Sequence, residues 1–169
     1  GRAYTISLRH RPKLNHGTGG FLTYGETPFP TFLSMLSSIE IDNAMRFAEL
    51  GCGTGRLSLF ASKLWDLEAV AYDLVEPFVQ NGNKIAKRHQ LNCTFLCRNA
   101  LDVDWSEFDI LYCTSTTYTE EYLAQLWKKC ETLKPSSHLF TLTHAPPKQL
   151  MDVVNTAVHS FSWGVATVF

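Results

Sequence analysis

The sequence predicts an α/β fold in which a mostly parallel sheet carries helices on both faces. Short apolar runs alternate with helix-like segments along most of the chain. A glycine-rich turn at residues 51–55 joins one of these runs directly to a helix-like segment. The length of 169 residues and the hydrophobic content of 45% suit one domain with a substantial core. We therefore expect a single domain over residues 1–169.

The first half of the chain alternates between two hydrophobic periodicities. Apolar side chains recur at helical spacing in some segments, while others are short apolar runs typical of buried parallel strands. A proline near its start favours the third helix. The expected order is helix 31–39, strand 45–50, helix 56–64, strand 68–74, helix 77–89 and strand 94–97.

The second half continues the pattern and then changes. We expect a strand at 108–113, a helix at 120–133 that ends before Pro135, and a strand at 138–143. Residues 151–158 and 165–169 are apolar and β-branched, which favours a closing antiparallel hairpin. These elements predict a sheet of seven strands.

The composition argues against several classes of protein. The formal net charge of −1 gives no strong nucleic-acid signal, although the first residues are locally basic at Arg2, Arg9, Arg11 and Lys13. The five cysteines include no Cys-x-x-Cys pair, which indicates a reducing compartment, and no His/Cys cluster has the spacing of a zinc site. No apolar run approaches the roughly 18 residues of a membrane span. We therefore expect a cytoplasmic protein without a metal.

The glycine turn and the acids near it predict a nucleoside pocket. Glu49 lies near the end of the first strand, and glycines follow at positions 51, 53 and 55. Glycine lets a ligand approach the main chain closely because it has no Cβ. Asp73 ends the second strand about 20 residues later, the distance at which a carboxylate meets ribose hydroxyls. The glycine spacing differs from the dinucleotide fingerprint, so pyrophosphate binding is not the favoured interpretation.

This acid and glycine pattern resembles motif I of the class I S-adenosylmethionine-dependent methyltransferases. The resemblance implies a Rossmann-like three-layer sandwich. Asn99 and Ala100 look like the family's pair beside the adenine, and residues 133–137 look like its turn before the fifth strand. The residues that the resemblance implies as cofactor contacts are Tyr24, Thr27, Glu49, Gly51, Cys52, Gly53, Gly55, Asp73, Leu74, Asn99, Ala100 and Cys113.

A second similarity is to the disruptor-of-telomeric-silencing histone-lysine methyltransferases, which lack a SET domain. Residues 24–27 with Phe29 resemble their segment before motif I, which contacts the methionine end of the cofactor, and Trp105 and residues 162–164 resemble two further short segments. This implies that residues 1–30 extend over the pocket. The chain departs from that family at 113–118, where paired asparagines are replaced. The acceptor therefore stays open, with a protein lysine as one possibility.

The chemistry implied is displacement at a sulfonium methyl, in which alignment of the nucleophile supplies most of the catalysis. The candidate catalytic residues are Tyr24, Glu26, Thr114 and Tyr118. Glu26 could orient the methionine amine or the acceptor, and the two tyrosines could exclude water. His144, just past the fifth expected strand, is a further possible base.

Each candidate also has a purely structural interpretation. Tyr24 and Phe29 could cap the core, while Glu26 and Thr27 could form only a turn and helix cap. Asp73 could cap a helix, Asn99 could form an Asx turn, and 114–117 could be a polar loop.

We predict an S-adenosylmethionine-dependent methyltransferase whose acceptor is an unidentified protein or small molecule. A non-catalytic cofactor-binding module acting through a partner is the main alternative, because the segment after the fourth strand departs from the family pattern. A nicotinamide-dependent oxidoreductase is disfavoured by the glycine spacing. The sequence does not distinguish a monomer from a dimer, nor whether the native chain is longer.

Overall fold

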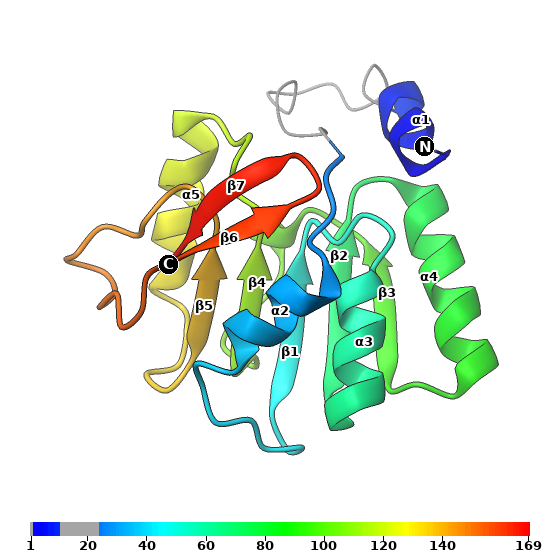
Figure 1. The fold of residues 1–169 in the computed structure, drawn as a ribbon, viewed down its shortest axis with the longest axis horizontal. Helices are drawn as coiled ribbons and strands as arrows, with labels where there is room; N and C mark the ends of the chain where they lie inside the picture. The colour runs from blue at the N-terminus through cyan, green and yellow to red at the C-terminus, as the bar shows by residue number, and fades with distance from the viewer. Residues whose placement is uncertain (1, 11–23) are drawn as a thin grey trace.

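The computed structural model describes residues 2–10 and 24–169 of the chain (Figure 1). Within these residues, five parallel strands form one sheet in the order β3-β2-β1-β4-β5. The strands are β1 (Arg46–Leu50), β2 (Glu68–Asp73), β3 (Cys93–Cys97), β4 (Ile110–Cys113) and β5 (His138–Thr141). The chain moves outward from β1 to β3 and then returns to the other side of β1. Open α/β sheets bind ligands at this reversal, outside the carboxyl ends of the strands.

Helices cover both faces of the sheet, as expected (Figure 1). The helices are α1 (Arg2–His10), α2 (Phe29–Leu36), α3 (Arg56–Trp65), α4 (Glu76–His89) and α5 (Glu120–Cys130), with a short 3-10 helix η2 (Ala100–Asp102). α2, α3 and α4 pack on one face around Phe32, Phe47 and Phe95. α5 packs on the other face, where Trp105 is fully buried. Its indole N–H donates to the Ala100 carbonyl at 2.8 Å.

The expected single sheet of seven strands is not what the structure shows. β6 (Ala157–Phe161) and β7 (Gly164–Val168) form a separate antiparallel hairpin. It meets the end of the main sheet at one bridge, between Leu142 and Val168, and through three backbone hydrogen bonds, two between Thr141 and Phe169 and one from the Thr143 N–H to the Thr167 carbonyl. Ala157 pairs with Val168, so residue 156 would face Phe169, whose backbone groups are already used. The segment 151–156 was therefore wrongly predicted as a strand.

Other boundaries shift for local reasons. α2 begins two residues earlier than expected, because Pro28 and the proline after Phe29 suit a helix start. α5 ends at Cys130, and β5 ends at Thr141 because Thr143 adopts a φ of 74°. The sequence interpretation missed α1 (Arg2–His10), whose residues were noted only for their basic charge.

Every helix within residues 2–10 and 24–169 is too short or too polar to cross a bilayer. The same residues bring together no group of three or more His, Cys, Asp or Glu that could hold a metal ion.

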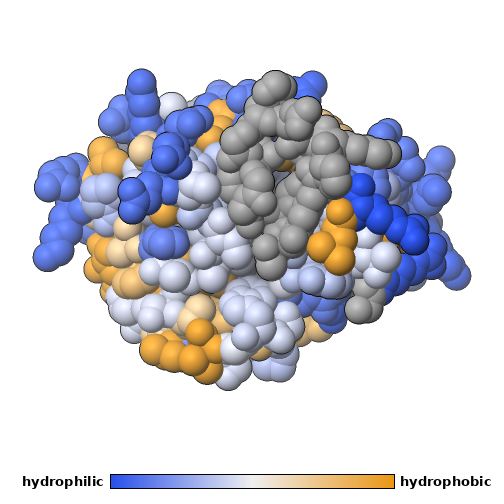
Figure 2. Space-filling view, turned by 90° about the horizontal axis from the view of Figure 1, so that it is seen from above, coloured by the Kyte–Doolittle hydropathy of each residue, from blue (hydrophilic) through white to orange (hydrophobic). Residues whose placement is uncertain are grey.

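Hydrophobic surface is unevenly distributed over the face that carries the carboxyl ends of the strands. In the view from above it gathers mainly on the left, the side on which Figure 1 places β5 and the ends of the hairpin (Figure 2). The right side is mostly hydrophilic.

Candidate functional site

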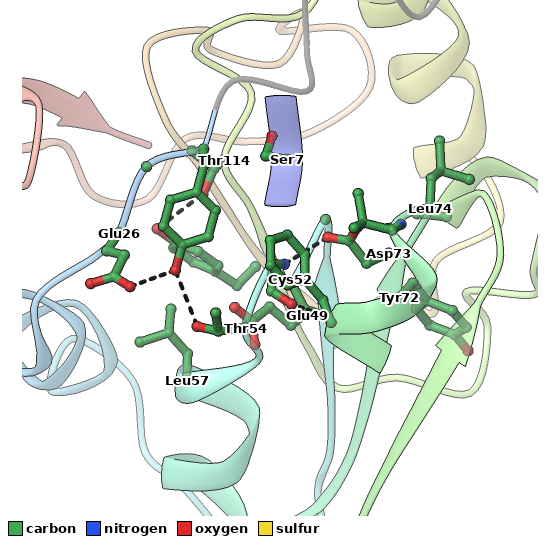
Figure 3. Close-up of a pocket in the computed structure, with 18 of the residues that line it drawn as sticks. Ser7, Glu26, Glu49, Cys52, Thr54, Leu57, Tyr72, Asp73, Leu74 and Thr114 are labelled. Carbon is green, nitrogen blue, oxygen red and sulfur yellow. Dashed lines mark hydrogen bonds between the residues drawn. The ribbon is translucent and has the colours of Figure 1, made fainter. Parts of the chain in front are cut away.

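A pocket of about 280 Å³ opens at the carboxyl ends of β1, β2 and β4. Its volume lies near the lower end of the roughly 300–1,000 Å³ range of small-molecule sites. The glycine loop and Asp73 form its floor, and Ser7 of α1 lies above them (Figure 3). Residues 24–27, which we call the strap, line it from the side of β4. The pocket thus joins segments from both ends of the described chain.

The glycine loop presents its Cα atoms to the pocket rather than its first N–H groups. Gly51 and Gly53 have φ values of 78° and 54°, a left-handed conformation that favours glycine. The N–H groups of Gly51 and Cys52 donate to the Tyr72 carbonyl at 2.9 and 2.8 Å. The N–H of Gly53 donates to Asp73. The loop is therefore held by its own hydrogen bonds, and Gly51, Cys52 and Gly53 line the pocket with little side-chain volume.

Two of the expected cofactor contacts lie outside the pocket wall. A Cβ on Gly55 would lie 1.8 Å from Cε1 of Phe95, so the third glycine is required by packing against β3. Cys113 is fully buried beneath the pocket, where its thiol donates to the Tyr118 hydroxyl at 3.6 Å. Both residues have packing roles in the fold, and their contact with a cofactor stays a prediction.

Asp73 has the position expected of a ribose ligand and also organises the loops. Its Oδ2 accepts a hydrogen bond from the Gly53 N–H at 2.7 Å, and its Oδ1 accepts one from the Val75 N–H at 2.8 Å. Burial raises the pKa of Asp73 to about 6, although these N–H bonds favour the ionised form. The carboxylate lines the pocket and retains lone pairs for a ligand.

Glu49 is buried behind the glycine loop and reaches the pocket floor. Its Oε2 accepts hydrogen bonds from the Ser58 N–H at 3.0 Å and from the Ser58 hydroxyl at 2.5 Å. Burial raises the pKa of Glu49 to about 8, and the nearby Asp73 charge acts in the same direction. Burial therefore favours the protonated form of the Glu49 carboxyl.

The strap is held in place by α3 and by the tip of the hairpin. The Tyr24 hydroxyl donates to Glu26 Oε1 at 2.5 Å, and Glu26 Oε2 pairs with Arg56 at 2.7 Å. The Glu26 N–H donates to the Ser162 hydroxyl at 2.7 Å. A Cβ on Gly25 would lie 2.3 Å from the ring of Trp163. Glu26 is thus both a pocket residue and part of an ion pair.

Three hydroxyl groups meet beside the strap. Thr27 Oγ1 and the Tyr112 hydroxyl are 2.5 Å apart, and the Thr114 hydroxyl donates to Tyr112 at 3.4 Å. All three residues line the pocket. Thr27 and Thr114 were expected here, whereas Tyr112 was read only as part of a strand.

The opposite end of the pocket lies beyond Asp73, next to β3. Leu74, Asn99 and Ala100 line it as expected. Asn99 Oδ1 accepts hydrogen bonds from the Leu101 N–H at 3.1 Å and from the Tyr122 hydroxyl at 2.9 Å. The Asx-turn interpretation of Asn99 is therefore correct, and it does not exclude contact with a ligand.

Sequence reasoning missed much of the lining. Some of these residues neighbour the motifs that were recognised, and others come from distant segments. They are Ser7, Thr54, Arg56, Leu57, Tyr72, Val75, Phe78, Arg98, Tyr112, Tyr122 and Trp163. Thr116 and Thr117, which also line the pocket, belong to the segment 114–117 already considered from the sequence. Position next to a strand end could have indicated Thr54, Val75 and Arg98. His144 is not among the lining residues, so the structure does not support it as a base.

Comparison with known proteins identifies the family. Residues 47–136, more than half of the chain, match the model of the family described as methyltransferase domain. The chain belongs to this methyltransferase family. The enzyme class expected from the sequence, a methyltransferase that uses S-adenosylmethionine, is thereby confirmed, while the methyl acceptor is not identified. None of the curated protein sequences matches the chain.

Solved structures share the fold of the chain at low sequence identity. An RNA methyltransferase from Salinibacter ruber, in complex with S-adenosyl-L-homocysteine, is 19% identical with a TM-score of 0.66, over 85% of this chain and 90% of that one. Geranyl diphosphate C-methyltransferase from Streptomyces coelicolor A3(2) is 18% identical with a TM-score of 0.59, over 67% and 45%. The [4+2]-cyclase SpnF is 18% identical with a TM-score of 0.60, over 83% and 56%. The chain spans about half the length of the last two proteins.

The residues present fit S-adenosylmethionine. A flat base needs apolar contact, and Leu74 and Ala100 line the pocket beside Asn99. Asp73 offers oxygens for the ribose. The lack of a Cβ at Gly51 leaves space beside the loop, whereas at Gly53 a Cβ would lie 3.0 Å from Cε2 of Tyr24.

Proposed function

We propose that the pocket binds S-adenosylmethionine with its adenosine toward β3 and its methionine end toward the strap. The observation that carries this proposal is the position of Asp73, which faces the pocket between the glycine loop and the β3 side. The strands lie in the order β3-β2-β1-β4. On the β3 side of the ribose, the base would lie beside Asn99, and on the other side the amino-acid end would lie beside Glu49 and Thr27. The S-adenosyl-L-homocysteine named for two of the similar structures supports this assignment.

The chain's own residues would hold and orient the ligand. Asp73 accepts from the ribose hydroxyls, and Glu49 and the hydroxyl of Thr27 face the polar amino-acid end. Tyr24 closes the pocket from the strap, where its ring packs at 5.7 Å from Phe78. When bound, the cofactor supplies a methyl group on a positively charged sulfur, which is already activated for transfer.

The acceptor would enter beside β4, where Thr114, Thr116, Thr117 and Trp163 line the wall. None of the described lining residues is a histidine or lysine, and Glu26 is ion-paired with Arg56. The acceptor side therefore offers no unpaired base. We infer an acceptor whose nucleophile needs no proton removed by the enzyme, such as a thiolate or a neutral amine.

A protein lysine is the finer possibility that the sequence resemblance suggested. It would arrive protonated and would have to lose its proton before transfer, since its pKa is near 10.4 in water. The family match and the low-identity structures carry no support for the histone-lysine type. The non-catalytic alternative is not favoured, because the family is one of methyltransferases.

Calorimetry with S-adenosylhomocysteine tests the cofactor assignment. Asp73→Ala should weaken binding by at least about tenfold, the loss expected for hydrogen bonds to a charged group. Asp152→Ala, on an exposed acid away from the pocket, is the matched control. Absence of binding to the unmodified protein would remove the proposal.

A second assay tests transfer. The protein is incubated with cell extract and methyl-labelled S-adenosylmethionine, and any labelled product is identified by its mass. A labelled thiol or small-molecule amine supports the acceptor class proposed above, whereas a labelled protein lysine favours the finer possibility. Cofactor binding without any labelled product would favour the non-catalytic module.

A further inference from the structure

The formal net charge of −1 is the sum of two parts of the chain with opposite charge. Residues 1–25 and 77–101 hold eight of the 15 Lys and Arg residues and none of the 16 Asp and Glu residues. The rest of the chain is therefore strongly acidic. A local excess of this kind determines which partners a surface attracts, whatever the total charge of the protein.

Six of these cations lie in the described part of the chain, and all six residues are exposed. They belong to α1, to α4 and to the turn after β3, and we call them the basic face. Its members are Arg2, Arg9, Lys84, Lys87, Arg88 and Arg98. Within residues 2–10 and 24–169, the cations in ion pairs are Arg46, Arg56 and Lys134. Among these residues, no acid neutralises the basic face.

The three cations of α4 form one stripe. Lys84, Lys87 and Arg88 follow at i, i+3 and i+4, so they share one side of the helix, opposite the side that buries Phe78 and Ala86. None of the large exposed apolar side chains of the described residues lies on α4. A helix that binds a lipid surface carries apolar side chains beside its basic ones, so this stripe suits a polyanion in solution better than a bilayer.

The basic face extends to the pocket. Arg98 lines the pocket, and so do Ser7 of α1 and Phe78 of α4. Lys84 follows Phe78 after about 9 Å of helix. Seen from above, the side of the molecule on which Figure 1 places α4 is mostly hydrophilic, whereas hydrophobic surface gathers on the opposite side (Figure 2).

An exposed aromatic ring accompanies this charge on α1. Tyr4 is 46% exposed, and it lies between Arg2 and Arg9 in the helix. Proteins bind single-stranded nucleic acids by stacking bases on aromatic side chains and by placing Lys and Arg along the phosphates. Charge and ring together therefore favour a nucleic acid over an acidic protein segment.

We propose that the basic face binds the phosphate backbone of a single-stranded nucleic acid, with a base stacked on Tyr4. A single strand is favoured over a duplex because its bases are free to stack on a side chain. A strand held along this face passes the pocket at Arg98. The inference goes beyond the proposed function and does not depend on it.

Fluorescence anisotropy with a labelled single-stranded RNA of mixed sequence, and with DNA of the same sequence, tests the inference over a range of salt concentrations. Replacing Lys84, Lys87 and Arg88 together by Gln should weaken binding at least about tenfold at low salt and should reduce the slope of log affinity against log salt by about two, since each phosphate contact contributes about 0.7. Tyr4→Ala should weaken binding at least about fivefold and leave the slope unchanged, because stacking releases no counterion.

Matched controls carry similar changes elsewhere on the surface. Replacing the exposed Lys63, Lys128 and Lys148 together by Gln removes the same charge, and Val154→Ala shortens an exposed apolar side chain. Both controls should bind nearly as tightly as the unmodified protein and keep its melting temperature, as should the test variants keep theirs.

Three results would overturn the inference. The first is a lack of saturable binding to both nucleic acids by the unmodified protein, and the second is an equal loss of affinity in the two triple variants. The third is binding to phosphatidylserine vesicles or to polyglutamate that is tighter than binding to RNA and DNA, which would identify a lipid surface or an acidic protein as the partner. Each leaves the cofactor assignment intact, because calorimetry with S-adenosylhomocysteine tests that assignment separately.

Discussion

Replacing Gly55 by alanine should damage the fold, whereas the same change at Gly51 should damage ligand binding. A Cβ at Gly55 would lie 1.8 Å from Cε1 and 2.5 Å from Cζ of Phe95. Phe95 cannot move aside easily, because a Cβ on Gly82 would lie only 2.4 Å from its Cδ1. Overpacking of this kind costs about 1–3 kcal/mol, and the left-handed φ of 68° adds about 1–2 kcal/mol for a residue with a Cβ.

The two costs together give a loss of about 2–5 kcal/mol in the free energy of unfolding for Gly55→Ala. Urea denaturation measures this loss directly. A Cβ on Gly51 would lie no closer than 3.5 Å to another group, the Tyr118 hydroxyl. Gly51→Ala should therefore lower the free energy of unfolding only through its left-handed backbone conformation. Gly51→Ala should also weaken the binding of S-adenosylhomocysteine, because the methyl group of the alanine enters the pocket. The reasoning is refuted if Gly55→Ala loses less than about 1 kcal/mol, or if Gly51→Ala is the less stable of the two.

Four further outcomes are expected. Affinity for S-adenosylhomocysteine should fall as the pH drops through about 6, where Asp73 protonates, and Asp73→Asn should flatten this profile. The raised pKa of Asp73 acts oppositely on folding: its contribution to stability is present below about pH 4 and is lost as the pH rises through 6. Binding at pH 7 should release a proton from Glu49 to the solvent, because the ligand's ammonium group favours the ionised carboxylate; the release is seen as a calorimetric enthalpy that depends on the buffer and is absent in Glu49→Gln. Gly25→Ala should lower the melting temperature by displacing Trp163, and Trp163→Ala should remove that loss; equal melting temperatures for Gly25→Ala and the unmodified protein would contradict this packing.

The central sheet could be predicted because buried parallel strands are continuous apolar runs. All five of its strands, and helices α3 and α4, lie within a few residues of the expected bounds. The limits of the hairpin were harder to predict from the sequence. They depend on the pairing of Phe169 with Thr141, a contact between distant positions. No local pattern of residues encodes that choice.

The candidate site was predicted in part for a related reason. Asp73 and Gly51 follow directly from strand ends, which all point to the same edge of the sheet. The roles of Gly55 and Cys113 depend on which neighbour each residue faces, and the motif does not contain this information. Tyr122 and Trp163 reach the pocket from a helix and a hairpin that the fold brings across the sheet.

The strap and the hairpin tip are separated by 136 positions in the sequence, yet they share a hydrogen bond between Glu26 and Ser162. A growing polypeptide folds from its earlier segments onward. The five-stranded layer can thus assemble on the ribosome while the wall formed by Trp163 is still missing. The chain would become able to hold a nucleoside only late in its synthesis. A chain that stops after β5 would be compact but would lack one wall of the pocket.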